Sequence, residues 1–370
     1  MKPQLEPSAR AVPVASPQIH ALTSLRGIAA WWVVLYHFDT YLLPFVPHAV
    51  FQLIARGYVA VDLFFCLSGF VIFLNYGKLK ISSPREVCIF YLRRLAKIYP
   101  LHLSTLGLYV LLVSAVILTH RDLPGPRFSL ENFILNIFLV QDWAVHSDLS
   151  WNIPSWSISA EFAAYLVFPV IVMAVRTTGG RLIPCLLGIA LLLCFLNYFF
   201  APVGFDLGKS IGTYGVPRCI IQFTIGAILA RMYLARTSMY RLVPFGLFAM
   251  AALFLIIGLN KMESVMVPLA WTTLVLAIAL ADKRLGFLNH PWLVFIGDIS
   301  YSTYMIHYLV RDIFKLLLVH PSQPTPISYV LAALAAVFIA SVPLYLLLER
   351  PAHRYLVKMM SARISAKTAS

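Results

Sequence analysis

The segment LRGIAAWWVVLYH (Leu25–His37) decides the fold class, because it carries two ionisable side chains within one apolar helix-forming stretch. Arg26 and His37 are separated by about three helical turns at about 100° per residue, so they share one face, about 16 Å apart along the axis. An ionisable group inside a membrane span is costly and usually faces a bundle interior or a wet cavity. We therefore expect a basic group near one membrane surface and an imidazole midway across.

The composition is that of a polytopic membrane protein. The 370 residues are 60% hydrophobic and 12% charged, whereas ordinary globular domains are about 25% charged. Apolar stretches of about 20 residues, the length needed to cross the hydrocarbon core, recur along the chain. We predict an all-α bundle of about ten spans, at roughly 22–43, 51–75, 99–118, 155–175, 182–200, 217–234, 241–259, 264–281, 293–316 and 327–348. A short apolar piece at 133–140 is too short to cross.

The distribution of Lys and Arg predicts the orientation of the spans. With a cytoplasmic N-terminus, the inner segments hold 20 of the 29 basic residues and the outer loops and outer span ends hold six. Inner loops of membrane proteins carry such an excess, so N-in and C-in topology follows. The chain then divides into a cytoplasmic tail at 1–20, a transmembrane domain at 21–355 and a cytoplasmic tail at 356–370. We expect the bacterial inner membrane as its location.

Several function classes receive no support from the sequence. The net charge of +14 reflects the inner-loop bias and attraction to anionic membrane lipid, and no nucleic-acid-binding motif accompanies it. The five cysteines make no CxxC or Cys/His spacing, so we expect no metal site and no permanently bound cofactor. No internal repeat supports an inverted-repeat transporter.

A basic cluster lies in FYLRRLAKIYP (Phe90–Pro100), on the predicted cytoplasmic side. Arg93, Arg94 and Lys97 form one patch on a helix, and Pro100 is expected to end or kink that helix. One interpretation is a stop signal pressed against lipid headgroups. The other is a clamp for the phosphates of an anionic ligand that enters from the cytosol.

The stretch VDLFFCLSGF (Val61–Phe70) places a second ionisable group, Asp62, inside a span. Asp62 is a candidate to orient the ring of His37 by accepting its second N–H. The neighbouring Ser68–Gly69 pair predicts close approach of another helix.

The stretch IPSWSISAEF (Ile153–Phe162) leads from an outer loop into a span. A carbohydrate at the outer mouth of the bundle could bind to its hydroxyls, its carboxylate Glu161 and the nearby tryptophans. The aromatic belts at membrane surfaces would place tryptophans in the same way. We predict an acceptor site formed by Trp151, Trp156 and Ser157.

The stretch ISYSTYMIH (Ile299–His307) predicts a polar stripe on a buried helix. Ser300, Tyr304 and His307 recur at helical spacing, and Arg311 continues the stripe outward. Hydrogen bonding between helices explains Ser300 and Tyr304, whereas His307 fits either a structural or a functional role. We add Tyr304 and His307 to the candidate substrate-binding residues.

Together these motifs resemble the membrane-bound acyltransferase-3 family, whose members O-acetylate surface polysaccharides, lipopolysaccharide, nodulation factors and some antibiotics. The resemblance runs over about residues 21–355 and includes ERP at 349–351. It implies a ten-span bundle in the stand-alone form, without the extra hydrolase-like domain of many relatives. The family's Arg-x10-His pattern falls on Arg26 and His37, and its paired basic motif on Arg94 and Lys97. Lys97 departs from the more frequent arginine and loses its bidentate geometry.

The resemblance implies an O-acyltransferase that takes acetyl or another acyl group from cytosolic acyl-CoA and delivers it to a carbohydrate or glycolipid hydroxyl. His37 would be the general base, and Asp62 or Glu161 would orient the base or the acceptor. The CoA phosphates would bind the basic side chains Arg26, Arg93, Arg94 and Lys97. The sequence leaves two alternatives open. One is a transporter of an anionic metabolite or lipid-linked sugar, and the other a structural partner in a polysaccharide assembly complex.

Overall fold

The computed structural model describes residues 18–119, 125–144, 148–235, 243–259, 261–320 and 323–369, with side chains up to residue 360. The predicted N-terminal tail, 1–20, lies outside the described residues except for its last three. The predicted C-terminal tail, 356–370, continues a helix as far as Ala369.

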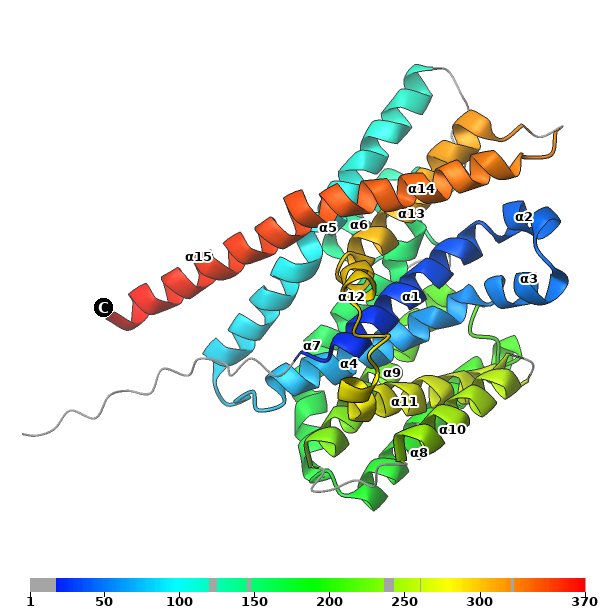
Figure 1. Ribbon diagram of the computed structural model, residues 1–370. Helices are drawn as coiled ribbons and strands as arrows, with labels where there is room; N and C mark the ends of the chain where they lie inside the picture. Colours follow the sequence, from blue (N-terminus) through cyan, green and yellow to red (C-terminus); the bar gives the residue numbers. More distant parts are fainter. Residues whose placement is uncertain are drawn as a thin grey trace, which may run out of the picture.

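The described residues form helices and turns without a strand (Figure 1), which confirms the predicted all-α class. The longer helices are α1 (His20–His37), α4 (Ala60–Tyr76), α5 (Pro84–Leu118), α7 (Trp156–Thr177), α8 (Leu182–Phe200), α9 (Ile211–Ala235), α10 (Val243–Gly258), α11 (Glu263–Ala281), α13 (Ser300–Leu318), α14 (Ile327–Pro343) and α15 (Arg350–Ala369). The short helices are α2 (Asp39–Leu42), α3 (His48–Ile54), α6 (Leu130–Phe138) and α12 (Pro291–Asp298). Single turns are η1 (Leu43–Phe45), η2 (Gly57–Val59), η3 (Gly125–Phe128), η4 (Ile153–Ser155), η5 (Ala201–Val203), η6 (Asp282–Arg284) and the π-helical η7 (Leu344–Glu349).

Seven helical stretches of the described chain are long and apolar enough to cross a membrane, so the protein is a multi-pass membrane protein. They contain α4, α5, α7, α8, α9, α11 and the α14–α15 run, and α10 is a shorter apolar helix. Three of the predicted spans are interrupted, and the one predicted at 51–75 runs through the end of α3 and the turn η2 before α4 begins. The span predicted at 22–43 stops at His37 and resumes as α2, and the one predicted at 293–316 divides at Ile299 between α12 and α13. The count of ten crossings stays a prediction.

Pro100 is predicted to end or kink its helix, and it does not end it, because α5 continues through it as one helix of 35 residues. Proline in a helix interior removes one backbone hydrogen bond. Ser104 Oγ donates a hydrogen bond to the Pro100 carbonyl oxygen, 2.8 Å away. The basic cluster and the following apolar span therefore form a single rod, and the basic side chains are fixed relative to the membrane-embedded part of α5.

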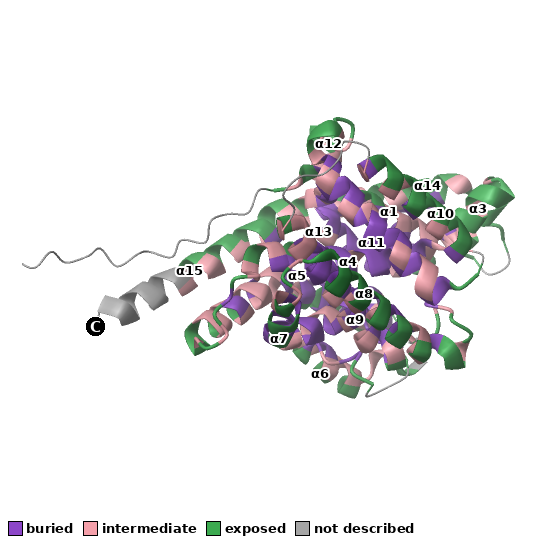
Figure 2. Ribbon diagram, turned by 90° about the horizontal axis from the view of Figure 1, so that it is seen from below, coloured by how far each residue is buried: buried purple, intermediate pink, exposed green. Residues whose placement is uncertain are grey.

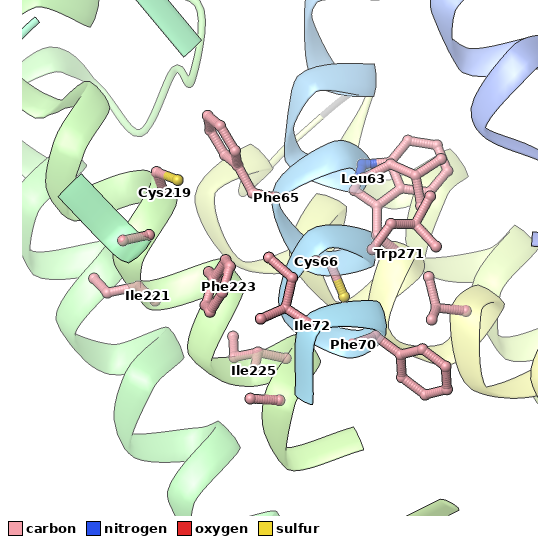
Figure 3. Packing of buried hydrophobic residues seen from close by; sticks show 14 of the residues in the cluster. Leu63, Phe65, Cys66, Phe70, Ile72, Cys219, Ile221, Phe223, Ile225 and Trp271 are labelled. Atoms are coloured by element: carbon pink, nitrogen blue, oxygen red, sulfur yellow. The ribbon is translucent and has the colours of Figure 1, made fainter. Parts of the chain in front are cut away.

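The centre of the bundle is the contact between α4 and α9 (Figure 3). A Cβ on Gly69 would collide with the backbone of Phe223, and a Cβ on Gly226 with the backbone of Cys66. Small residues at helix crossings allow the backbones to approach closely in membrane proteins. The predicted close approach at Gly69 is confirmed, and it fixes the position of α4 beside the functional residues that follow.

Buried residues gather on α4 and α11, and exposed residues are frequent on α8 (Figure 2). Leu187, Leu191 and Phe195 of α8 are 50% or more exposed, as expected for side chains that contact lipid. On the other side, α14, η7 and α15 follow one another along a line that packs against α5 (Figure 1). This pairing brings the end of η7 beside the basic residues of α5.

Candidate functional site: two cavities on one bundle axis

The structure contains a cavity of about 430 Å³ among the ends of α1, α4, α5, α7 and α13. We call it the arginine cavity, because Arg26 and Arg94 line it together with Lys97 and Glu161. Its size falls in the range of about 300–1,000 Å³ that is typical of small-molecule sites. The cavity opens at the end of the bundle for which the basic residues predict a cytoplasmic location.

Arg26 and Arg94 keep hydrogen-bonding capacity for an anion. Arg26 donates one bond to the carbonyl oxygen of Gly297 at 2.9 Å, and Arg94 donates one to the Tyr76 hydroxyl at 3.4 Å. The Nε–H of each guanidinium is buried without a partner, and neither pairs with a carboxylate among the described residues. A buried, unsatisfied donor of this kind is costly unless a ligand occupies it.

Lys97 differs from these two arginines, because its charge is already compensated. Its Nζ lies 2.6 Å from Oε1 of Glu349, a buried carboxylate that also accepts a hydrogen bond from Ser302 at 2.7 Å. Glu349 belongs to the ERP motif at 349–351, but its position in the sequence predicted no role for it. Glu349 could have been predicted as a partner of the basic motif, because it is a carboxylate at the predicted cytoplasmic end of the last apolar span.

Arg93 does not line the arginine cavity, although the sequence analysis placed it in the same clamp. Successive residues on a helix point about 100° apart, so Arg93 and Arg94 face different sides of α5. Arg94 and Lys97, three residues apart, share the side that faces the cavity. The predicted patch therefore reduces to Arg94 and Lys97.

Glu161 also lines the arginine cavity, which corrects its predicted place at an external mouth. It accepts hydrogen bonds from Ser68 and, at 2.6 Å, from the hydroxyl of Tyr165. The side chain lies more than one turn inside α7, on the same face as Ser157. Glu161 is thus positioned beside the predicted donor site rather than beside an acceptor.

A second cavity, of about 300 Å³, lies farther along the same helices. We call it the histidine cavity, because His37 lines it with Tyr58, Trp156, Tyr308 and Arg311. His37 is the last residue of α1, nearer one end of the span than the predicted midpoint. The carbonyl oxygen of His37 has no partner inside the helix and accepts a hydrogen bond from Arg311 Nε at 2.6 Å. This contact holds the end of α1 against α13.

The ring of His37 contacts another histidine, and no carboxylate of the described residues forms a hydrogen bond or ion pair with it. Its Nδ1 lies 2.9 Å from the carbonyl oxygen of Val33 and 3.1 Å from Nε2 of His307. His307 is fully buried behind His37 and lines neither cavity. The predicted substrate contact of His307 stays a prediction, and the contact that the structure shows is with the proposed base.

Asp62 does not orient His37, contrary to the sequence interpretation. Its carboxylate forms a buried bidentate pair with Arg218, at 2.7 and 2.5 Å, and accepts a further bond from Gln222. A buried charge requires such a partner, and a guanidinium matches the geometry of a carboxylate better than an imidazole does. Arg218 stacks on Trp156, lines the histidine cavity and also donates a hydrogen bond to the Leu207 carbonyl oxygen.

The predicted acceptor residues separate in the structure. Trp151 lies in an apolar cluster beside Phe128 and Phe133 and lines neither cavity. Its backbone has a φ of 48°, and its carbonyl oxygen accepts a hydrogen bond from Arg127. Trp156 lines the histidine cavity, whereas Ser157 lines the arginine cavity. Tyr304 lines both.

Tyr304 forms the layer between the two cavities. Its hydroxyl lies 2.8 Å from the Ser157 hydroxyl and donates to the Pro154 carbonyl oxygen at 3.1 Å, while the edge of Phe64 meets its ring. Each of α1, α4 and α13 contributes residues to both cavities. The cavities are therefore consecutive along one axis of the bundle, with the arginines at one end and His37 at the other.

Comparison with known proteins gives the family of the chain. A family model described as an acyltransferase domain matches residues 19–346. Acyltransferase MdmB of Streptomyces mycarofaciens is 31% identical over 329 residues, covering 80% of each chain. O-acetyltransferase OatA of Staphylococcus aureus is 24% identical over 321 residues, which are 78% of this chain and 49% of OatA. No solved structure matches the chain. The family model covers nearly the whole helical bundle, and this protein belongs to the membrane-bound acyltransferase-3 family that its motifs resemble.

Proposed function

We propose that this enzyme transfers an acyl group, acetyl in the first instance, from acyl-CoA in the arginine cavity to a carbohydrate hydroxyl in the histidine cavity. Acyl transfer itself follows from the family and from the O-acetyltransferases among its relatives. The donor, the acceptor and the side from which each enters are our proposal. The acceptors we expect are extracytoplasmic, such as exopolysaccharide, O-antigen or lipo-oligosaccharide.

The observation that carries the proposal is the position of Tyr304, which alone among the described residues lines both cavities. The arginine cavity and the histidine cavity therefore adjoin each other at this side chain. The pantetheine arm of CoA is long and thin enough to pass this side chain, whereas a carbohydrate chain is not. In this arrangement the phosphates of acyl-CoA remain bound to Arg26 and Arg94 while its thioester extends to His37.

The arginine cavity suits the phosphates of CoA. Arginine pairs with phosphate oxygens through charge-assisted hydrogen bonds, and Arg26 and Arg94 line the cavity without a carboxylate partner among the described residues. Glu349 balances the positive charge of Lys97. Lys97 therefore helps to position the phosphates but adds little net attraction for them. The two arginines are therefore the main phosphate ligands in our proposal.

The histidine cavity suits proton removal from a hydroxyl. His37 takes the hydroxyl proton as the oxygen attacks the thioester carbon, the carbon–sulfur bond breaks, and the CoA thiolate leaves and receives that proton. The products are an ester and free CoA. The aromatic rings of Tyr58, Trp156 and Tyr308 around His37 offer apolar contact to the faces of a sugar.

Sealed vesicles of known orientation test the proposal. Radiolabelled acetyl-CoA supplied on the predicted cytoplasmic side should label an oligosaccharide acceptor enclosed on the other side, whereas acetyl-CoA supplied on the acceptor side should not. Passage of intact acetyl-CoA or of free acetate without an acetylated product would favour a transporter. Equal use of donor from both sides would contradict the two-sided arrangement.

A further inference from the structure

The hydrogen bonds of His307 define which of its nitrogens carries a proton. His307 Nδ1 lies 2.7 Å from the carbonyl oxygen of Tyr304, and a carbonyl oxygen can only accept. Nδ1 therefore carries the hydrogen. In the neutral ring, Nε2 is then a lone pair that accepts a hydrogen bond.

The same reasoning applies to His37. Its Nδ1 faces two acceptors, the carbonyl oxygen of Val33 at 2.9 Å and Nε2 of His307 at 3.1 Å. Nδ1 must therefore be the protonated nitrogen of the neutral ring. Nε2 is left as the basic nitrogen and has no partner among the described residues, while the residue lines the histidine cavity.

We propose that His307 is a positioning residue that holds His37 in the tautomer protonated at Nδ1, so that Nε2 is the atom that removes the acceptor proton. The inference rests on the proposed function. It identifies a role for a buried histidine that lines neither cavity, and it assigns the reacting atom of the base.

A chain of three groups from two helices supports this arrangement. The Tyr304 carbonyl oxygen fixes His307, and His307 fixes His37, while Arg311 holds the end of α1 through the His37 carbonyl. Orienting partners of functional histidines set both the tautomer and the ring direction. Here the partner is a neutral imidazole, and no described carboxylate contacts His37. The ring of His37 is therefore oriented without contact to a negative charge, which would hold the proton taken from the acceptor hydroxyl on His37.

The proton transfer balances with this assignment. The acceptor O–H proton moves to His37 Nε2, the oxygen bonds to the acyl carbon, and the electrons of the carbon–sulfur bond go to sulfur. The imidazolium then returns the Nε2 proton to the thiolate. His37 Nδ1 keeps its hydrogen throughout, so its bond to His307 survives the whole cycle.

Nitrogen NMR of the full chain tests the tautomer directly. Protein with ¹⁵N-labelled histidine in nanodiscs, at neutral pH, gives separate signals for protonated and unprotonated ring nitrogens. The His37 signals are assigned by their loss in His37→Ala. We expect Nδ1 to be protonated and Nε2 to be unprotonated. A wild-type His37 protonated at Nε2 would overturn the proposal, whatever the variants do.

Two variants of His307 test the effect on catalysis. His307→Met removes the acceptor at similar length, and we expect kcat to fall about 10- to 100-fold, as for other orienting partners, with the KM for both substrates unchanged. His307→Gln offers an amide oxygen near the place of Nε2 and should recover most of kcat. A folded His307→Met enzyme with wild-type kcat would overturn the inference. If wild-type protein transfers no label from acetyl-CoA, the proposed function fails, while the NMR result still reports the tautomer.

Discussion

The hydroxyl oxygens of Tyr304 and Ser157 lie 2.8 Å apart and close the layer between the arginine cavity and the histidine cavity. The two residues come from α13 and α7, and the Pro154 carbonyl oxygen adds a second bond to the tyrosine. As long as its ring is present, a tyrosine in this place separates the arginine cavity from water that enters the histidine cavity. Water exclusion protects a reactive thioester from hydrolysis.

Removal of the Tyr304 ring should uncouple hydrolysis from transfer. In Tyr304→Ala we expect acyl transfer to fall on the order of 100-fold, because lost positioning near reacting atoms has that effect, and acceptor-independent release of CoA thiol to rise. Tyr304→Phe should keep hydrolysis low. The measurement is thiol release with and without acceptor. Tyr301→Ala, which alters only the arginine cavity, is the matched control, and equal hydrolysis in both alanine variants would contradict the barrier role.

Donor binding should depend on Arg94 and not on its neighbour. Loss of a charge-assisted contact costs about 1.5–3 kcal/mol, so Arg94→Ala should raise the KM for acyl-CoA about 10- to 150-fold. Arg93→Ala removes the same charge from the same helix but not from the cavity, and should leave KM near the wild-type value. Michaelis–Menten kinetics on both purified variants decide the matter. Similar effects of both changes would favour a general membrane-surface role.

The pair of Lys97 and Glu349 should respond asymmetrically to mutation. Lys97→Met leaves a buried carboxylate unpaired, which costs about 3–5 kcal/mol of unfolding free energy. Glu349→Gln should cost less, because the Lys97 side chain is 40% exposed and its charge can reach water. The double variant should be more stable than Lys97→Met. Thermal unfolding in detergent measures all three, and a double variant less stable than Lys97→Met would contradict this account.

The membrane orientation is a prediction that reporters can test. Fusions after Phe45 should read outside and fusions after Ser82 inside, because the basic residues cluster in the loop that contains Ser82. A fusion after Ser82 that reads outside would place the arginine cavity on the wrong side for a cytosolic donor.

Some of the site was predictable from sequence because it is local. Arg26 and His37 share one helix face, and the eleven-residue spacing was sufficient to place them at two heights of one bundle axis. Arg94 followed in the same way from helical spacing on α5. In each case the regular geometry of a single helix supplied the answer.

The remaining contacts depend on how helices turn against each other. Asp62 pairs with Arg218, and His307 lies behind His37, each across more than 150 residues of chain. A span that is apolar on all sides gives no periodic signal for its rotation, so the sequence did not fix the face of α7 that carries Glu161. The close contact of Gly69 on α4 with Phe223 on α9 is one packing constraint of this kind.

The most direct test of the account is the rate of label transfer from acetyl-CoA in His37→Ala. Loss of a general base costs about 10²–10⁴-fold, so we expect a loss of that size in a protein that still inserts and folds. His20→Ala, at the exposed start of the same helix and outside both cavities, should transfer at the wild-type rate. A well-expressed His37→Ala variant with wild-type activity would contradict the central claim that His37 is the base.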